Sequence, residues 1–234
     1  MKNIKSIFIR DKRVFSVFDK EIFVKEIIKE KKILIAMNSK KIVIDDSKYI
    51  DIVNKNIAYP DGMPVAKALV KKGQKSIKYP GHKLWLDIID ETYKEKNFYI
   101  IGATSEVVKE VVEKLKNIYP NINILNYRDG YLNEEDISIL KKDLQDKKPD
   151  IVFVAMGFPK QDYFMQELYD SFPALYMGLG GSFNVFTGRA SLVPLWWEKY
   201  IKSEGLYRIL QDPKKLSRQK YTLKFLFYYY LNKL

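Results

Sequence analysis

The chain contains no cysteine and a single histidine, His82. Without cysteine there can be no disulfide, no thiolate zinc site and no cysteine nucleophile. With only one histidine, the chain cannot supply both a catalytic histidine and a second histidine as a metal ligand. We interpret His82 as an incidental loop residue.

Long apolar runs are also missing. No stretch approaches the ~20 apolar residues that a transmembrane helix needs, and the first residues, Met1–Lys5, lack the apolar segment of a signal peptide. We therefore expect a cytoplasmic protein. The 234 residues are enough for one sizeable domain or two small ones, and a hydrophobic content of 47% argues against disorder.

Acidic residues are too few to balance the basic ones, and the formal net charge is +12. Such an excess indicates an anionic partner: nucleic acid, an anionic membrane surface or nucleotide phosphates. More than half of the excess lies from Lys199 onward, where only Glu204 and Asp212 oppose the bases. Segregation of the charge into one tail argues against a nucleic-acid-binding face spread over the fold.

The tail combines this charge with aromatic residues. Residues 225–231 read FLFYYYL and have lysines on both sides. Lysine and aromatic residues together are typical of a membrane interface, on which so short a segment can lie but not span. The alternative is a helix that packs on the core with a solvated basic face.

Apolar strands alternate with helical patterns through the rest of the chain. The clearest unit runs from Asn97 to Pro120: a strand ends at Gly102, and Thr104 or Ser105 can cap a helix with valines at helical spacing. Strands that are apolar on both faces predict a parallel sheet covered by helices on both sides, a Rossmann-like α/β fold. The composition changes near Pro194, which divides the chain into a Rossmann-like main domain (1–193) and a C-terminal helical basic and aromatic appendage (194–234).

Ligands of such sheets bind at the carboxyl ends of the strands. The polar and glycine-containing turns at those ends are therefore candidate substrate-binding residues: Asn38, Gly102, Ala103, Asp129, Gly130, Gly157, Lys160, Gln161, Gly180 and Gly181. In "GFPKQD", Lys160 and Gln161 would stand at the positive end of a helix, where an anion or sugar hydroxyls can be held. An ordinary strand–helix turn explains the same residues equally well.

Two signals for nucleotide or metal binding are absent. "GATSEVV" lacks the G-x-G-x-x-G spacing of a dinucleotide site. No Asp-x-Asp pair occurs, the device by which many nucleotide-sugar enzymes hold a divalent metal on the diphosphate, and Glu134-Glu135-Asp136 is better explained as a helix start. We expect no metal and no cofactor. Arginine and lysine must then neutralise any leaving diphosphate.

Asp61 lies in "AYPDGMPVAKALVKKG", between a short apolar stretch and a helical pattern. Pro60 and Gly62 are turn residues. From the residues alone, Asp61 turns the chain and caps a helix, or it takes a proton from a substrate. Nothing in the composition decides between these two roles.

Seven motifs occur in the order and spacing of one known family: "MNSKKI", "YPDGMPVAKALVKKG", "FYIIGAT", "NYRDGYL", "GFPKQDYF", "GLGGSFNVFTG" and "GLYRILQDPKKLSR". From about Lys31 to Arg218 the chain resembles the WecG/TagA/CpsF glycosyltransferases. The resemblance implies a Rossmann-like fold and metal-independent, inverting transfer from a UDP-sugar, such as UDP-N-acetylmannosamine. The implied acceptor is a sugar on undecaprenyl diphosphate, in teichoic acid, capsule or other cell-surface polysaccharide synthesis. It also implies a place on the inner face of the cell membrane with no nucleic-acid partner, and it leaves a homo-oligomer open.

The resemblance also assigns roles. Asp61, followed by Gly62, matches the proposed catalytic base. Asn38 matches a pocket residue after the first core strand, and Gln161 matches a polar residue near the donor sugar. Lys78 stands where the family has an arginine. The remaining matches are three positions of the appendage at which the family has arginine and which would hold the diphosphate. Two of them are arginine here and one is lysine: Arg208, Lys215 and Arg218.

The chain departs from the family pattern at Ala36, Lys83, Leu192 and Gly205, and Asp162 replaces a glutamate. Several of these positions would lie near the donor, so they bear on which sugar is transferred. A transferase for another donor, such as UDP-glucuronate or a UDP-hexose, is one alternative. A basic nucleic-acid- or membrane-binding protein without activity is an alternative of another class.

Overall fold

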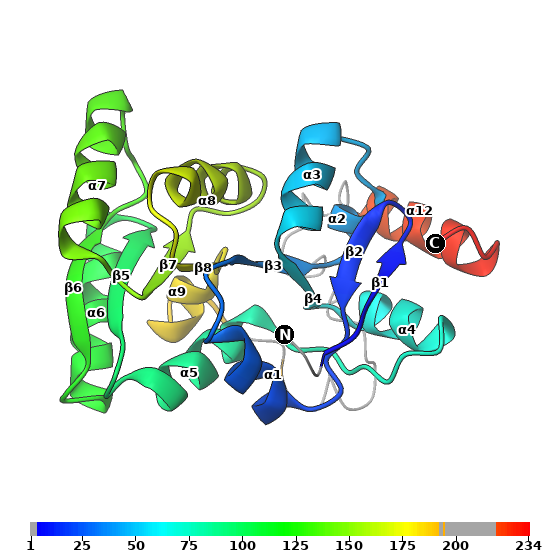
Figure 1. Cartoon of the computed structure of the whole chain (residues 1–234), viewed down its shortest axis with the longest axis horizontal. Helices are drawn as coiled ribbons and strands as arrows, with labels where there is room; N and C mark the ends of the chain where they lie inside the picture. The colour runs from blue at the N-terminus through cyan, green and yellow to red at the C-terminus, as the bar shows by residue number, and fades with distance from the viewer. Residues whose placement is uncertain (1–3, 192–193, 195–218) are drawn as a thin grey trace.

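The computed structural model describes residues 4–191, 194 and 219–234. Its centre is a six-stranded sheet in the order β4-β3-β8-β7-β5-β6, in which all neighbouring strands are parallel (Figure 1). The strands are β3 (Ile33–Met37), β4 (Ile57–Pro60), β5 (Asn97–Gly102), β6 (Asn123–Arg128), β7 (Ile151–Ala155) and β8 (Leu175–Gly178). The predicted parallel α/β fold is confirmed.

Both faces of the sheet are buried, as the continuous apolar strands predict. Along β5, Phe98 and Ile100 pack into one hydrophobic cluster, while Tyr99 and Ile101 pack into the cluster on the opposite face. This alternation is the two-residue period of a strand.

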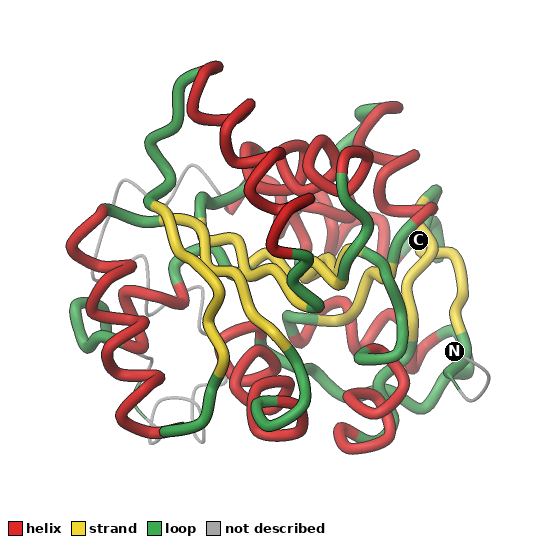
Figure 2. The backbone as a smooth tube through the Cα atoms, turned by 60° about the vertical axis from the view of Figure 1, so that its left-hand side comes forward, coloured by secondary structure: helices red, strands yellow, loops and turns green. Residues whose placement is uncertain are grey.

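Helices cover the two faces, and Figure 2 shows the strands between them. One layer holds α1 (Lys20–Ile27), α5 (Gly81–Thr92), α6 (Ser105–Ile118) and α9 (Ser182–Phe186). The other layer holds α2 (Ser39–Val43), α3 (Ser47–Lys55), α4 (Met63–Lys71), α7 (Glu134–Lys147) and α8 (Lys160–Ser171). Thr104 caps α6, as predicted, because its side chain accepts a hydrogen bond from the Val107 N–H.

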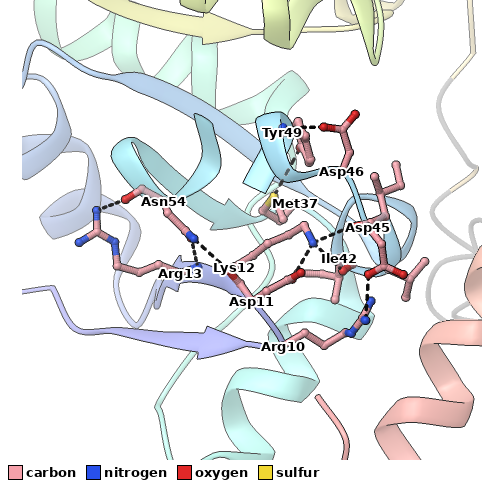
Figure 3. A network of polar contacts seen from close by, with 12 residues as sticks. Arg10, Asp11, Lys12, Arg13, Met37, Ile42, Asp45, Asp46, Tyr49 and Asn54 are labelled. Atoms are coloured by element: carbon pink, nitrogen blue, oxygen red, sulfur yellow. Dashed lines mark hydrogen bonds and ion pairs between the residues drawn. The ribbon is translucent and has the colours of Figure 1, made fainter. Parts of the chain in front are cut away.

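An antiparallel hairpin of β1 (Ser6–Ile9) and β2 (Lys12–Phe15) lies outside the main sheet, with β2 beside β4. It is anchored by Lys12, whose fully buried ammonium group donates to the carbonyl oxygens of Ile42 and Ile44 and to the Asp11 carboxylate (Figure 3). Burial lowers the pKa of Lys12. This hairpin was not predicted, and the burial of Lys12 depends on carbonyl oxygens that lie far away in the chain.

The C-terminal helix α12 (Gln219–Tyr230) packs against α2, and Figure 1 shows it in red beside the hairpin. Phe225 is buried in the core, Lys224 forms an ion pair with Asp45, and the Arg10 guanidinium lies 4.6 Å from the centre of the Tyr228 ring. No helix within the described residues is long and apolar enough to cross a membrane.

Several predicted residues lie outside the described part of the chain: Leu192, Gly205, Arg208, Lys215 and Arg218. Their roles stay predictions. The boundary at 193/194 borders the same stretch and is likewise untested.

We predict that Asp143→Asn makes the protein less sensitive to acid. Burial opposes ionisation of Asp143, but hydrogen bonds from the Tyr99 hydroxyl at 2.6 Å and the Asn126 amide at 2.7 Å outweigh it and lower its pKa. A carboxyl whose folded pKa is lowered stabilises the fold above its unfolded pKa of about 4, and this stability is lost as the pH falls through the folded value.

Urea unfolding at pH 7 and pH 3 measures the effect. The loss of stability between the two pH values should be smaller in Asp143→Asn than in the wild type. The exposed Asp146→Asn on the same helix is the matched control and should follow the wild type. Equal acid sensitivity of all three proteins would contradict the prediction.

Candidate functional site

All the candidate residues within the described part of the chain lie at or just beyond the carboxyl ends of the six strands, except Lys78, which reaches this edge from a loop. They fall into three groups that follow the strand order: the ends of β4 and β3, the ends of β8 and β7, and the ends of β5 and β6. The edge is continuous, because each group borders the next.

The first group surrounds Asp61. The backbone N–H groups of Asp61 and Gly62 both donate to the carbonyl oxygen of Met37, at 3.1 and 3.4 Å, which fixes the end of β4 over the end of β3. Asn38 follows Met37 directly, and Gly62 lies against its Cα and Cβ atoms. The predicted convergence of Asn38, Asp61 and Gly62 is therefore present.

Asp61 does cap a helix, but not the helix that follows it. Its Oδ1 atom accepts a hydrogen bond of 2.8 Å from the backbone N–H of Gly81, the first residue of α5, while α4 begins at Met63 and its N-cap residue, Gly62, supplies no side-chain cap. The Tyr79 N–H donates to the Pro60 carbonyl oxygen, so the segment that contains Lys78 runs beside the end of β4. The same geometry places His82 in the first turn of α5, and its interpretation as a loop residue was wrong.

The second group is organised by Gln161. Its buried Oε1 atom accepts hydrogen bonds from the backbone N–H groups of Gly157, at 3.1 Å, and Gly180, at 2.9 Å. One side chain thus ties the turn after β7 to the glycine-rich loop after β8, which continues into Gly181. Gly157 and Gly180 have φ angles of 76° and 55°, a region that favours glycine. Gln161 supports the two loops in this structure, and its amide nitrogen lies against Gly178.

The third group joins the ends of β5 and β6. The Gly130 N–H donates to the Ala103 carbonyl oxygen, and the Lys160 ammonium group donates to the Gly130 carbonyl oxygen at 3.3 Å. Gly102 has a φ angle of 126°, and a Cβ there would lie 2.3 Å from the Ala155 carbonyl oxygen, so no other residue fits. Lys160 therefore links this group to the second one.

A shallow pocket of about 290 Å³ opens beside Asp129. The Ser105 hydroxyl donates to Asp129 Oδ2 at 2.5 Å, and the Tyr131 N–H donates to Oδ1 at 2.9 Å; these two bonds lower the pKa of Asp129. Arg128 and Tyr131 also line the pocket. The Asp129 carboxylate is therefore kept ionised. It lies at the opposite end of the carboxyl edge from Asp61.

A buried ion pair that sequence reasoning missed lies beneath the site. The Lys41 ammonium group is 2.6 Å from Asp162 Oδ2, and the two side chains are only 5% and 1% exposed. The Tyr49 hydroxyl donates to the same oxygen at 3.2 Å. Lys41 follows Asn38 by one helical turn, and its N–H donates to Asn38 Oδ1, while Asp162 follows Gln161. The pair therefore connects the first group to the second.

Two buried oxygens near this pair, the Tyr59 hydroxyl and Asp162 Oδ1, have no hydrogen-bond partner among the described residues. Burial raises the pKa of the Tyr59 hydroxyl, and the negative charges of Asp61 and Asp162 raise it further. Tyr59 stays protonated, and its hydroxyl lies close to Gly81, the residue that donates to Asp61.

The sequence held a weak signal for the buried pair. Lys41 and Asp162 each lie within a motif. A charged residue in a helix is normally interpreted as solvent-exposed, so only the fold shows that the two side chains form an ion pair. Among the described residues, no three histidine, aspartate or glutamate side chains cluster as a metal site would require.

Together, the edge offers a carboxylate held by the backbone, glycine loops with free space around Gly157 and Gly180, and the start of α8. Helix starts and glycine loops suit phosphate groups, and a positioned carboxylate suits proton transfer. The arrangement is compatible with an α/β enzyme that binds a phosphorylated ligand.

Comparisons with known proteins agree. The chain belongs to the glycosyl transferase WecG/TagA/CpsF family, whose model matches residues 15–234. It is 34% identical to the N-acetylglucosaminyldiphosphoundecaprenol N-acetyl-beta-D-mannosaminyltransferase of Bacillus subtilis (strain 168), over 77% of this chain and 72% of that protein. The family resemblance is thus confirmed, and the protein is a glycosyltransferase.

We predict that breaking the buried pair destabilises the protein. Lys41→Met or Asp162→Asn leaves one polar partner buried and uncompensated, which costs about 3–5 kcal/mol. The double variant Lys41→Met/Asp162→Leu removes both charges and should recover part of the loss. Urea denaturation gives the free energies of unfolding.

The exposed pair Lys141–Glu167, with side chains 32% and 49% exposed, supplies the control. Lys141→Met should cost less than about 1 kcal/mol. Losses of similar size in Lys41→Met and Lys141→Met would show that the buried pair does not hold the edge together.

Proposed function

We propose that the protein transfers a sugar from a UDP-sugar to a hydroxyl of a lipid-linked sugar, with inversion at the anomeric carbon. The observation that carries the proposal is Asp61, held at the end of β4 by the Met37 carbonyl oxygen and the Gly81 N–H. The Met37 carbonyl oxygen holds the backbone of Asp61, and the Gly81 N–H holds its carboxylate, so a carboxylate of fixed position stands at the carboxyl edge and is a suitable general base.

The reaction is a single displacement. The acceptor oxygen attacks the anomeric carbon as its proton passes to the Asp61 carboxylate. The bond from the anomeric carbon to the diphosphate oxygen breaks, and UDP leaves with the electron pair. Attack from the face opposite the leaving group inverts the configuration.

The negative charge that develops on the leaving diphosphate has to be stabilised by cations and N–H groups. The turn at Gly157, the start of α8 and the loop at Gly180 and Gly181 lie between Asp61 and the Asp129 pocket along the edge. We assign the diphosphate to this central part, with Arg208, Lys215 and Arg218 as its cations and Lys78 beside Asp61.

The Bacillus relative, by its name, transfers an N-acetylmannosaminyl group to N-acetylglucosaminyldiphosphoundecaprenol. A UDP-N-acetylmannosamine-like donor and an undecaprenyl diphosphate-linked acceptor are therefore our first choice. Two departures from the family lie near Asp61: Ala36 pairs with Tyr59 on the neighbouring strand, and Lys83 is exposed in the first turn of α5. They favour testing other UDP-sugars, including UDP-glucuronate and UDP-hexoses, in the same assay.

We further propose that α12 rests on an anionic membrane surface, on its cytoplasmic side. Three of its large side chains, Leu223, Phe227 and Tyr230, are 66%, 60% and 73% exposed. Lys220 and Lys224 lie on the same helix and suit anionic headgroups. A peripheral position of this kind brings the site to a lipid-linked acceptor.

We predict that Asp61→Asn lowers the turnover of sugar transfer by about 10²- to 10⁴-fold while the affinity for the UDP-sugar is unchanged. Asparagine cannot take the proton, but its amide oxygen can still accept the Gly81 N–H, so the melting temperature should stay near that of the wild type. Transfer is measured with a lipid-linked acceptor and donor binding by calorimetry.

Asp61→Ala separates the two roles of the residue. It removes both the base and the cap of α5, so it should also lose about 0.5–2 kcal/mol of stability. Asp51→Asn, an exposed position on α3, is the control and should be fully active. Full activity of Asp61→Asn would contradict the assignment of Asp61 as the general base.

We also expect metal chelation to leave the rate unchanged, because the chain has no Asp-x-Asp pair and supplies Arg and Lys for the diphosphate. The transfer rate is compared before and after EDTA treatment, with added Mg²⁺ or Mn²⁺ as the control. Strong inhibition by EDTA that either ion reverses would contradict metal-independent transfer.

A further inference from the structure

A groove of about 420 Å³ runs along the outer face of α4 to α12. Its floor and walls are apolar: Met63, Ala66 and Val70 follow each other at helical spacing, and Tyr229 of α12 closes one side. Lys67 and Lys71 stand at its rim. Met63 and Val70 are 44% and 54% exposed, so the groove is open to the surroundings.

One end of the groove lies at the proposed catalytic base. Met63 is the first residue of α4 and follows Asp61 by two positions. The other end, at Lys71, is roughly 12 Å further along the helix at 1.5 Å per residue. A molecule in the groove would thus have one end at the reacting centre and would extend away from it along the protein surface.

The far end of the groove is joined to α12. The Lys71 ammonium group donates to the Tyr229 carbonyl oxygen at 2.5 Å and lies 4.3 Å from the centre of the Tyr229 ring. Leu226, Tyr230 and Leu231, in the same C-terminal segment as Tyr229, are exposed apolar or aromatic side chains. An apolar path with lysines along it therefore leads from Asp61 to the helix that we place on the membrane.

We infer that this groove binds the isoprenoid chain of the lipid-linked acceptor, with Lys67, one helical turn from Met63, serving its diphosphate. This inference rests on the proposed function and adds where the acceptor lipid lies. The volume falls within the range of ligand pockets, and Met63, Ala66 and Val70 offer apolar contact to a linear chain, with Ser76 as the uncharged polar residue of the lining. A concave groove with a cationic rim matches a single chain that carries an anionic head, whereas a bilayer surface contacts the convex face of α12.

The test compares two acceptors with the same sugar diphosphate head, one with a long isoprenoid chain and one with a short, water-soluble chain. Val70→Glu places a charge in the groove and should raise the KM for the long-chain acceptor about tenfold or more. The KM for the short-chain acceptor, the KM for the donor and the binding to anionic vesicles without acceptor should be unchanged. Ile139→Glu, an equally exposed position on α7 at 52%, is the matched control and should leave all four values unchanged.

Three outcomes would overturn the inference: equal effects of Val70→Glu on both acceptors, equal effects of Val70→Glu and Ile139→Glu, or a loss of vesicle binding that accounts for the loss of activity. A photoactivatable isoprenyl diphosphate without sugar separates this inference from the proposed function. If the wild type transfers no sugar but residues 63–71 are labelled, the proposed function fails and the groove stands. If transfer occurs and the label maps elsewhere, the groove fails and the function stands.

Discussion

The ion pair between Lys41 and Asp162 fixes the two sides of the carboxyl edge relative to each other. Lys41 belongs to the short helix that Asn38 caps, and Asp162 belongs to the helix whose Gln161 holds the glycine loops. Both charges are out of contact with solvent, where an unpaired charge is far more costly than at the surface. This contact therefore adds a side-chain link between the region of Asp61 and the glycine loops to the strand pairing of β3 with β8, and loss of either partner leaves the other charge buried and unpaired.

This contact also reaches the C-terminal helix. The neighbouring Lys40 lies 5.0 Å from the centre of the Phe158 ring and 5.3 Å from that of Tyr221 on α12. Phe158 belongs to the turn that begins at Gly157, and Lys41 lies 4.9 Å from the centre of the same ring. Lys40 thus contacts both α12, through Tyr221, and the turn after β7, through Phe158. A membrane-bound α12 would act on the same part of the edge to which we assign the diphosphate.

The sequence predicted the fold well where local patterns decide it. Apolar strands such as β5 and β7 and the capped helix α6 follow from short-range periodicity, and the parallel sheet follows from their alternation. The hairpin of β1 and β2 did not follow, because Lys12 is stabilised by carbonyl oxygens of Ile42 and Ile44, far away in the chain. No local pattern reports a contact of that kind.

The candidate site divides in the same way. The position of a residue at a strand end is a local property, so Asn38, Asp61 and Gln161 were placed correctly at one edge. What each side chain does there depends on partners from other elements. Asp61 caps α5 rather than α4, because the chain between them folds back beside Pro60, and Gln161 binds backbone N–H groups of two loops instead of facing outward. In the proposed function, a base that also caps a helix is held in place before substrate arrives, which reduces the ordering that the reaction requires.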